Sequence, residues 1–321
     1  MNYNAVSFPN LGIGQIKLNP TALEINDNLS IKWYAVIIVI GIIAAFLFCN
    51  RFRKTINVNE DDFLDCILYA IPLGFVGARL TYVIGDLENF HSLMDVIAIW
   101  NGGLAIYGGI IFAALTVFTV CRIKKCSFTK MLDIMAIGLL IGQMIGRWGN
   151  FVNIEVYGVE TDLPWAMGIG YYGEGADMLV HPLFLYESLW NLIGFILIYG
   201  YKDYRKFNGE LFLWYLSWYS LGRGLMEPLR DPEFNLKIFG VRIMIVLAVV
   251  LFIVSVVAII ILRRRSTGYI QQTLKNNDSE YENQFNIDLS DIELTEEDYN
   301  AKKLYDALDK KTEEQQNGKD N

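Results

Sequence analysis

Charge is scarce in this chain of 321 residues, and that scarcity excludes most soluble folds. Only 19% of the residues are charged, 53% are hydrophobic, and the mean hydropathy is positive. A soluble protein of this length carries more charge and interrupts its apolar runs more often. The run from Ile243 to Leu262 contains no charged residue. As a helix it would be about 30 Å long, which is the hydrocarbon thickness of a bilayer.

Histidines, paired cysteines and clusters of basic residues are also scarce. The two histidines, His91 and His181, are too few and too far apart in sequence to indicate a metal site. The four cysteines form no CxxC pair, so neither a zinc site nor a disulfide framework is expected. Residues 266–321 hold 14 acidic and 6 basic residues, which accounts for the whole net charge of −8. The rest of the chain is neutral and has no basic footprint for nucleic acid.

Long apolar runs are what the sequence has instead. A single run of this kind could be a buried core helix, but seven runs of similar quality favour membrane spans. The sequence therefore predicts an all-α polytopic membrane protein of about seven transmembrane helices. The expected spans are residues 33–49, 63–85, 103–121, 131–150, 183–201, 210–228 and 243–262.

The distribution of basic residues predicts the orientation. Thirteen Lys and Arg residues follow the odd-numbered spans: Arg51, Arg53, Lys54, Arg122, Lys124, Lys125, Lys130, Lys202, Arg205, Lys206, Arg263, Arg264 and Arg265. The opposite side has few, among them Lys17, Lys32, Arg230 and Lys237. Basic loops stay in the cytoplasm, so the amino terminus should lie outside and the carboxyl terminus inside.

Three regions follow from this topology. Residues 1–32 form an extracytoplasmic segment, and residues 33–265 form the membrane domain. Within that domain the loop 151–180, rich in Gly, Tyr and Trp, is expected to form a small extracytoplasmic head. Residues 266–321 are polar and acidic and should be a largely disordered cytoplasmic tail.

Ionisable residues within membrane spans are costly and are therefore candidates for function. Five stand out near the outer ends of the predicted spans: Arg79, Arg147, Glu155, Arg223 and Glu227. Arg223 and Glu227 are spaced i, i+4 and share one helix face. They could simply neutralise each other, and for this pair alone that alternative is equally good. Pro228, which follows directly, predicts a kink or a helix end.

Glycines flank several of these polar positions. Gly138, Gly142 and Gly146 recur every four residues and would let another helix approach closely. Taken alone they indicate only a packing face, but Asn150 continues the same stripe. Tyr107 lies between two Gly-Gly pairs and by itself would be read as an interfacial aromatic residue.

These segments together resemble the prolipoprotein diacylglyceryl transferase family over about residues 30–262. The most specific stretch runs from Gly146 to Gly158 and is similar to the family signature G-R-x-G-N-F-x-N-x-E-x-x-G. The supporting stretches are Ile31–Tyr34, Gly77–Tyr82, Gly102–Gly109, His181–Glu187 and Arg223–Arg230. Their order, spacing and predicted topology all agree with the family.

The resemblance implies a reaction in a bacterial plasma membrane. Such an enzyme transfers the diacylglyceryl group of phosphatidylglycerol to the thiol of the lipobox cysteine in a prolipoprotein signal peptide. A thioether forms and glycerol phosphate leaves. The family needs no metal and no organic cofactor, so the expected partners are membrane lipid and the signal peptide.

The resemblance also implies roles for individual residues. Arg147 and Arg223 would grip the phosphate, Asn150 would orient the headgroup, and Glu155 and Glu227 would hold the arginines or assist proton transfer. Tyr107 stands where many members have His; a tyrosine hydroxyl is protonated at pH 7, so it is either a hydrogen-bonding residue or an activated base. Substrate-binding roles are expected for Tyr34, Arg79, Asn153, Gly158, His181, Tyr186, Glu187 and Arg230.

Two further departures concern the headgroup contacts. Val159 replaces a frequent Arg and Ile154 replaces a frequent Gly.

Two other classes of function compete with the enzyme. A transporter or lipid flippase also uses arginines and broken helices, although the chain shows no internal repeat. A membrane scaffold would not need such costly polar groups.

Overall fold

The computed structural model describes residues 5–26, 29–98, 102–176, 178–234, 237–238 and 241–285. The chain divides into two compact units, Met1–Ile259 and Ile260–Asn321. The first unit contains all the elements that carry the candidate residues.

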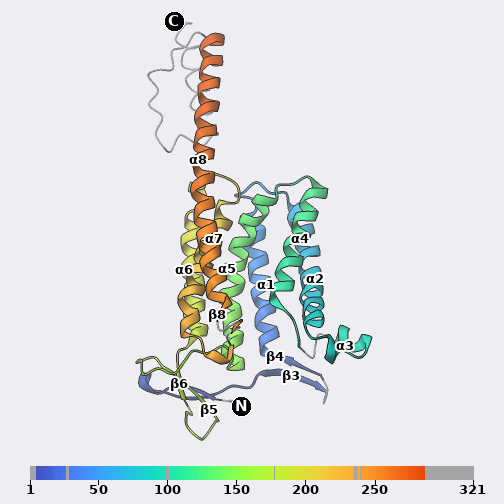
Figure 1. The fold of residues 1–321 in the computed structure, drawn as a ribbon, viewed down its shortest axis with the longest axis vertical. Coiled ribbons are helices and arrows are strands. Elements are labelled where there is room, and N and C mark those ends of the chain that lie inside the picture. The colour runs from blue at the N-terminus through green and yellow to red at the C-terminus, as the bar shows by residue number, and fades with distance from the viewer. Residues whose placement is uncertain are drawn as a thin grey trace. The chain divides into compact units, whose positions relative to one another are not determined.

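Helices dominate the first unit (Figure 1). Its long helices are α1 (Trp33–Phe52), α2 (Glu60–Gly85), α4 (Ile106–Lys124), α5 (Phe128–Asn153), α6 (Leu183–Gly200) and α7 (Glu210–Met226), followed by the start of α8 (Ile243–Phe285). Among the described residues, six helices are long and apolar enough to cross a membrane. They are α1, α2, α4, α5, α6 and the part of α8 from Ile243 to Ser266. The chain is therefore a multi-pass membrane protein. The helix at the remaining predicted span, α7, has 17 residues.

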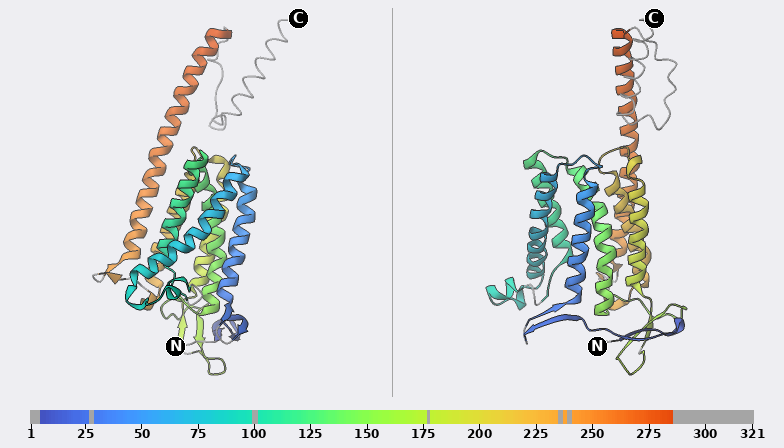
Figure 2. Two further views of the ribbon diagram at one scale, coloured as in Figure 1. Left: turned by 90° about the vertical axis from the view of Figure 1, so that its right-hand side faces the viewer. Right: turned by 180° about the vertical axis from the view of Figure 1, so that it is seen from behind.

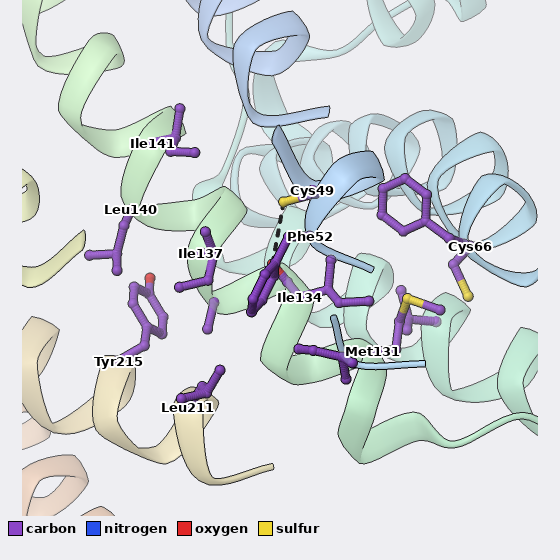
Figure 3. Packing of buried hydrophobic residues seen from close by; sticks show 14 of the residues in the cluster. Cys49, Phe52, Cys66, Met131, Ile134, Ile137, Leu140, Ile141, Leu211 and Tyr215 are labelled. Carbon is purple, nitrogen blue, oxygen red and sulfur yellow. Dashed lines mark hydrogen bonds between the residues drawn. The ribbon is translucent and has the colours of Figure 1, made fainter. Parts of the chain in front are cut away.

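Helix α5 packs against α1, α4, α6 and α7, so it lies at the centre of the bundle. Its buried residues Met131, Ile134, Ile137 and Leu140 form one core with side chains from the surrounding helices (Figure 3). The Cys49 thiol of α1 donates to the Ile134 carbonyl oxygen at 3.4 Å, which marks the close approach of α1.

The predicted glycine stripe explains part of that approach. A Cβ atom on Gly138 would lie 3.0 Å from the Cys49 sulfur, and one on Gly146 would lie 3.2 Å from the Ile38 side chain. A Cβ on Gly142 would meet no atom within 4 Å, but the Gly142 carbonyl oxygen would lie 3.6 Å from a Cβ on Gly41 of α1. All three glycines therefore lie on the face of α5 that α1 approaches.

Small antiparallel sheets lie at one end of the helices of this unit (Figure 2). The four-stranded sheet has the order β2-β1-β5-β6 and joins the N-terminal segment to the loop between α5 and α6. Its strands are β1 (Ala5–Phe8), β2 (Ile13–Lys17), β5 (Met167–Gly170) and β6 (Met178–Val180). Two hairpins accompany it, β3 (Thr21–Asn26) with β4 (Leu29–Lys32) and β7 (Lys237–Ile238) with β8 (Val241–Arg242). The short helical elements are η1 (Pro9–Leu11), η2 (Leu87–Asn89), α3 (Leu93–Ile97), η4 (Lys202–Tyr204), η5 (Glu227–Leu229) and η6 (Pro232–Phe234).

Strand pairing reveals which connections share an end of the bundle. Ala5 of β1 pairs with Gly170 of β5, so the segment before α1 lies beside the segment after α5. Four long helices separate these strands in the chain. Because this number is even, the chain returns to the end of the bundle from which it started. Gly158 likewise forms a bridge with Arg230, although α6 and α7 intervene. Helix α6 therefore crosses the bundle in one direction, and α7 crosses back in the other.

Helices α6 and α7 are joined by a pair of stacked indoles. The rings of Trp190 and Trp218 lie 4.3 Å apart between centroids. Each indole N–H donates to the backbone carbonyl oxygen of the other tryptophan, at 3.0 and 2.9 Å. A Cβ on Gly194 would lie 2.4 Å from the Trp218 ring, and one on Gly222 would lie 2.2 Å from the Trp190 ring. The two glycines thus make room for the two rings.

Several boundaries differ from those predicted. Helix α4 begins at Ile106, because Gly102 and Gly103 adopt positive φ angles that end regular backbone geometry. Helix α8 extends to Phe285, into the segment for which we expected disorder, and no proline occurs between residues 266 and 285 to stop it. The remainder of the expected tail, 286–321, lies outside the described residues. The N-terminal segment supplies two strands of a sheet, which the sequence had not indicated.

We predict that Gly194→Ala lowers the free energy of unfolding by about 1–3 kcal/mol, because the added methyl group overlaps the Trp218 ring and forces the indole pair apart. Thermal unfolding of the purified protein in detergent measures the change. Gly200→Ala, in the last turn of the same helix and with open space around it, is the matched control and should not destabilise. Equal effects of the two substitutions would contradict the assigned role of Gly194.

Candidate active site

Three helix ends bring charged side chains together beside the sheets. Arg147 comes from the last two turns of α5, Glu187 from the second turn of α6, and Arg223 from the last turn of α7. Arg147 forms an ion pair with Glu187. The Glu187 carboxylate also lies 3.0 Å from Nη2 of Arg230 and 4.0 Å from Nη1 of Arg223. One buried carboxylate is therefore shared by three guanidinium groups.

A second carboxylate supports the same arginines. Glu227 is fully buried and lies 2.8 Å from Nη2 of Arg223, so the predicted i, i+4 pair is formed. Its carboxylate is also 3.8 Å from Nε of Arg230. Helix α7 ends at Met226 and continues as the short turn η5 through Pro228, as the proline predicts. Arg242 donates to the backbone carbonyl oxygen of Glu227 at 3.1 Å and ties this turn to the start of α8.

Asn150 and Glu155 extend the cluster beyond Arg147. The Asn150 side-chain oxygen accepts from Nη1 of Arg147 at 3.3 Å, and its amide nitrogen donates to the Glu155 carboxylate at 2.8 Å. Ile154 and Val156 flank Glu155 with φ angles of 51° and 59°. This left-handed conformation costs a non-glycine residue about 1–2 kcal/mol. The chain thus turns sharply after α5, and Glu155 faces back toward Asn150.

Two tyrosines border the cluster from other helices. Tyr34, in the first turn of α1, packs so closely on Gly149 that a Cβ there would lie 2.7 Å from its ring. Tyr107, near the start of α4, is half-exposed, and its hydroxyl donates to the Met244 sulfur at 2.7 Å. Tyr34 thus contacts the end of α5 beside Asn150, and Tyr107 contacts the start of α8.

Four other predicted residues hold the loop between α5 and α6 in place. The Tyr186 hydroxyl accepts from the Trp165 indole at 2.6 Å and lies 3.3 Å from Nδ1 of His181. Burial lowers the pKa of His181 below its usual 6.5, so the imidazole is neutral at pH 7. Gly158 donates its N–H to the His181 carbonyl, and a Cβ there would lie 2.5 Å from the His181 Cβ. Asn153 is the last residue of α5.

Arg79, another predicted substrate-binding residue, contacts the backbone of a different segment of the chain. Its guanidinium donates to five backbone carbonyl oxygens, those of Asp95, Val96, Ala98, Gly102 and Gly103, at 2.6 to 3.3 Å. It also lies 5.2 Å from the Phe90 ring centroid. These contacts hold α3 and the following loop against α2, and they account for the polar group within the span.

Comparison with known proteins identifies the family of this chain. Residues 20–261 match the profile of the prolipoprotein diacylglyceryl transferase family. This chain belongs to that family. A phosphatidylglycerol–prolipoprotein diacylglyceryl transferase of Finegoldia magna is 40% identical over 70% of this chain and 88% of its own length. A protein of the same name from Listeria monocytogenes is 38% identical over 79% of this chain and 93% of its own length. The diacylglyceryl transferase numbered 1 of Clostridium perfringens is 38% identical over 77% of this chain and 96% of its own length.

The departures of this diacylglyceryl transferase family member from the usual pattern have structural explanations. At Ile154 the backbone is left-handed, a conformation that suits glycine. Its side chain is buried in a small core with Val6, Met167 and Ile169, and this burial offsets the strain. Val159 contributes its backbone, donating to the Leu229 carbonyl and accepting from the His181 N–H.

Sequence reasoning missed how these residues are connected. It paired Arg223 with Glu227 because they are close in sequence, but it gave no sign that Glu187 is the common partner of arginines on three segments. It also missed Arg242. A basic residue directly before an apolar span, on the side with few basic residues, is the signal that could have found it.

We predict that Glu187→Gln lowers the free energy of unfolding by about 3 kcal/mol, because removing one partner leaves buried guanidinium groups without their shared counter-charge. Thermal unfolding in detergent measures the loss. Asp203→Asn, which breaks an exposed pair with Lys202 at the other end of α6, should change stability by less than about 1 kcal/mol. Similar values for both variants would show that Glu187 does not organise the cluster.

Proposed function

We propose that this protein transfers the diacylglyceryl group of phosphatidylglycerol to the lipobox cysteine of prolipoproteins, the first step of bacterial lipoprotein maturation. The names of its relatives support this function. The structural observation that carries it is the gathering of Arg147, Arg223 and Arg230 around Glu187 at one end of the bundle. The described ion pairs join three guanidinium groups to two carboxylates, which suits a site that receives an anionic phosphate.

The topology that we propose has seven spans in the bacterial plasma membrane. A 17-residue helix is about 26 Å long, near the lower limit for a span, and the Gly158–Arg230 bridge supports a crossing by α7. The basic loops after α1, α4 and α6 then lie in the cytoplasm. The arginine cluster, the sheets and the amino terminus lie at the opposite, extracytoplasmic end. This end is where the headgroups of outer-leaflet lipids and a translocated signal-peptide cysteine are accessible.

The chemistry is a substitution at the carbon that carries the phosphate ester. The cysteine sulfur forms a bond to that carbon, the carbon–oxygen bond breaks, and glycerol phosphate departs with the electron pair while the thiol loses its proton. Arginines that hold the phosphate stabilise the charge that develops on the leaving oxygen. They also favour the thiolate, which is the reactive form of the cysteine.

The remaining residues have supporting roles in this proposal. Asn150 accepts a hydrogen bond from the Arg147 guanidinium, and Glu155 orients the Asn150 amide by accepting from its nitrogen. In this proposal Tyr107 supplies a hydroxyl near the reacting groups; in the structure this hydroxyl donates to the Met244 sulfur. The neutral His181 and Tyr186 fix the loop that closes over this end.

We predict that Arg147→Ala reduces diacylglyceryl transfer at least about 100-fold, because a phosphate-stabilising group of the transition state is lost. Mass spectrometry of a lipobox peptide incubated with phosphatidylglycerol and the purified protein detects the added diacylglyceryl mass. Arg51→Ala, at an exposed position in the last turn of α1 at the far end of the bundle, is the control and should transfer normally. Retained turnover in Arg147→Ala, or no transfer by the unaltered protein, would refute the proposal.

We also predict that Tyr107→Phe lowers kcat about 10-fold or more while thermal stability falls by less than about 1 kcal/mol, since the change removes a half-exposed hydroxyl and leaves the ring. The same peptide assay and thermal unfolding in detergent measure both quantities. Tyr69→Phe, on an exposed face of α2, should alter neither. If the rate of Tyr107→Phe were unchanged, Tyr107 would be only a packing residue.

A further inference from the structure

A small cavity lies between α6 and α7, directly beside the arginine cluster. It has a volume of about 20 Å³, enough for one water-sized group. Glu187 and Arg223 line one part of it, and Trp190, Asn191 and Gly222 line another. The 4.0 Å separation between Glu187 and Nη1 of Arg223 is too long for a hydrogen bond. The cavity therefore adjoins the charged cluster, and the proposed mechanism assigns no role to Trp190, Asn191 or Gly222, which also line it.

Asn191, which lines this pocket, has an unsatisfied hydrogen-bond acceptor. The residue is only 5% exposed, and its amide nitrogen donates to the Glu187 backbone carbonyl at 2.7 Å. This bond fixes the orientation of the amide, because the reverse orientation would bring two oxygen atoms together. The side-chain oxygen is buried and has no partner among the described residues. A buried acceptor left without a donor costs about 1–3 kcal/mol, so a ligand that supplies an O–H or N–H is favoured there.

We propose that the Asn191 side-chain oxygen accepts a hydrogen bond from a hydroxyl of the phosphatidylglycerol headgroup and so makes Asn191 a determinant of lipid specificity. This inference rests on the proposed function and extends it. In phosphatidylglycerol the free hydroxyl groups belong to the headgroup glycerol. Glu187 and Asn191 are spaced i, i+4, so their side chains lie about 6 Å apart, within reach of a glycerol whose phosphate is held by the arginines.

The pocket also explains how other headgroups are rejected. An ammonium headgroup supplies donors but would lie beside three guanidinium groups and two carboxylates, whose net positive charge disfavours it. A headgroup without hydroxyls leaves the Asn191 oxygen unpaired. Sites built to bind a substrate hydroxyl discriminate strongly against analogues that lack it, for this reason.

The test compares two lipids with identical acyl chains, phosphatidylglycerol and phosphatidylpropanol, whose headgroup has no hydroxyl. The kcat/KM for transfer to a lipobox peptide is measured with each lipid in mixed micelles. We expect the unaltered protein to prefer phosphatidylglycerol about 10-fold or more. Asn191→Leu, a substitution of similar shape, should lower kcat/KM for phosphatidylglycerol to the value for phosphatidylpropanol. Its rate with phosphatidylpropanol should stay within about twofold of the unaltered protein.

Gln143→Met is the matched control. The Gln143 side chain is also an amide whose buried oxygen has no described partner, and its nitrogen donates to the Tyr215 hydroxyl at 2.8 Å. It lies on α5 and does not line the pocket, so this variant should keep the preference for phosphatidylglycerol.

Three results would overturn the inference. They are equal use of both lipids by the unaltered protein, a preference retained in Asn191→Leu, or an equal loss with both lipids in Asn191→Leu. The first needs no variant, so the inference stays testable even if Asn191→Leu fails to fold. A preference retained in Asn191→Leu is the result expected if a bound water satisfies the Asn191 oxygen. Failure of the unaltered protein to modify the peptide with either lipid would instead refute the proposed function.

Discussion

The arrangement of this site depends on one carboxylate. Glu187 holds arginines that come from the end of α5, the end of α7 and the segment that follows α7. Three like charges so close together would repel one another strongly in a medium of low dielectric constant. Their shared counter-ion makes the cluster possible, and it does so at a helix position that the surrounding packing fixes firmly.

The packing around Glu187 holds its helix in a fixed position. The stacked indoles of Trp190 and Trp218 lock α6 to α7 close to the carboxylate. At the other end of the bundle, the buried Asp133 of α5 accepts from the backbone N–H groups of Gly209 and Phe212 and so caps the start of α7. Helix α7 is thereby held at both ends, and Arg223 reaches the cluster in a defined position. The strained turn after α5 sets Glu155 against the Asn150 amide, which in turn accepts from Arg147.

Much of this organisation could be predicted from the sequence, because it depends on local pattern. Uninterrupted apolar runs located the spans, and the i, i+4 spacing with Pro228 located the Arg223–Glu227 pair and the helix end. The remainder depends on contacts between distant segments, which no local pattern encodes. Arg79 illustrates the difference: a charge within a span marks a position that needs partners, but whether these are a substrate or five backbone carbonyl oxygens depends on where α3 lies. Asn191 is the converse case, since an asparagine in an apolar helix gives no sign that one of its atoms is unsatisfied.

The central position of β1 in its sheet bears on how the protein is assembled during synthesis. β1 contains the first described residues to be made, and one of its two neighbours, β5, follows about 160 residues later. Four long helices must be inserted before that neighbour emerges, so the backbone groups on one edge of β1 have to remain solvated until then. Closure of the sheet is consequently a late event that requires an even number of membrane crossings between its strands, since a single helix that failed to cross would leave β1 and β5 on opposite sides of the bilayer.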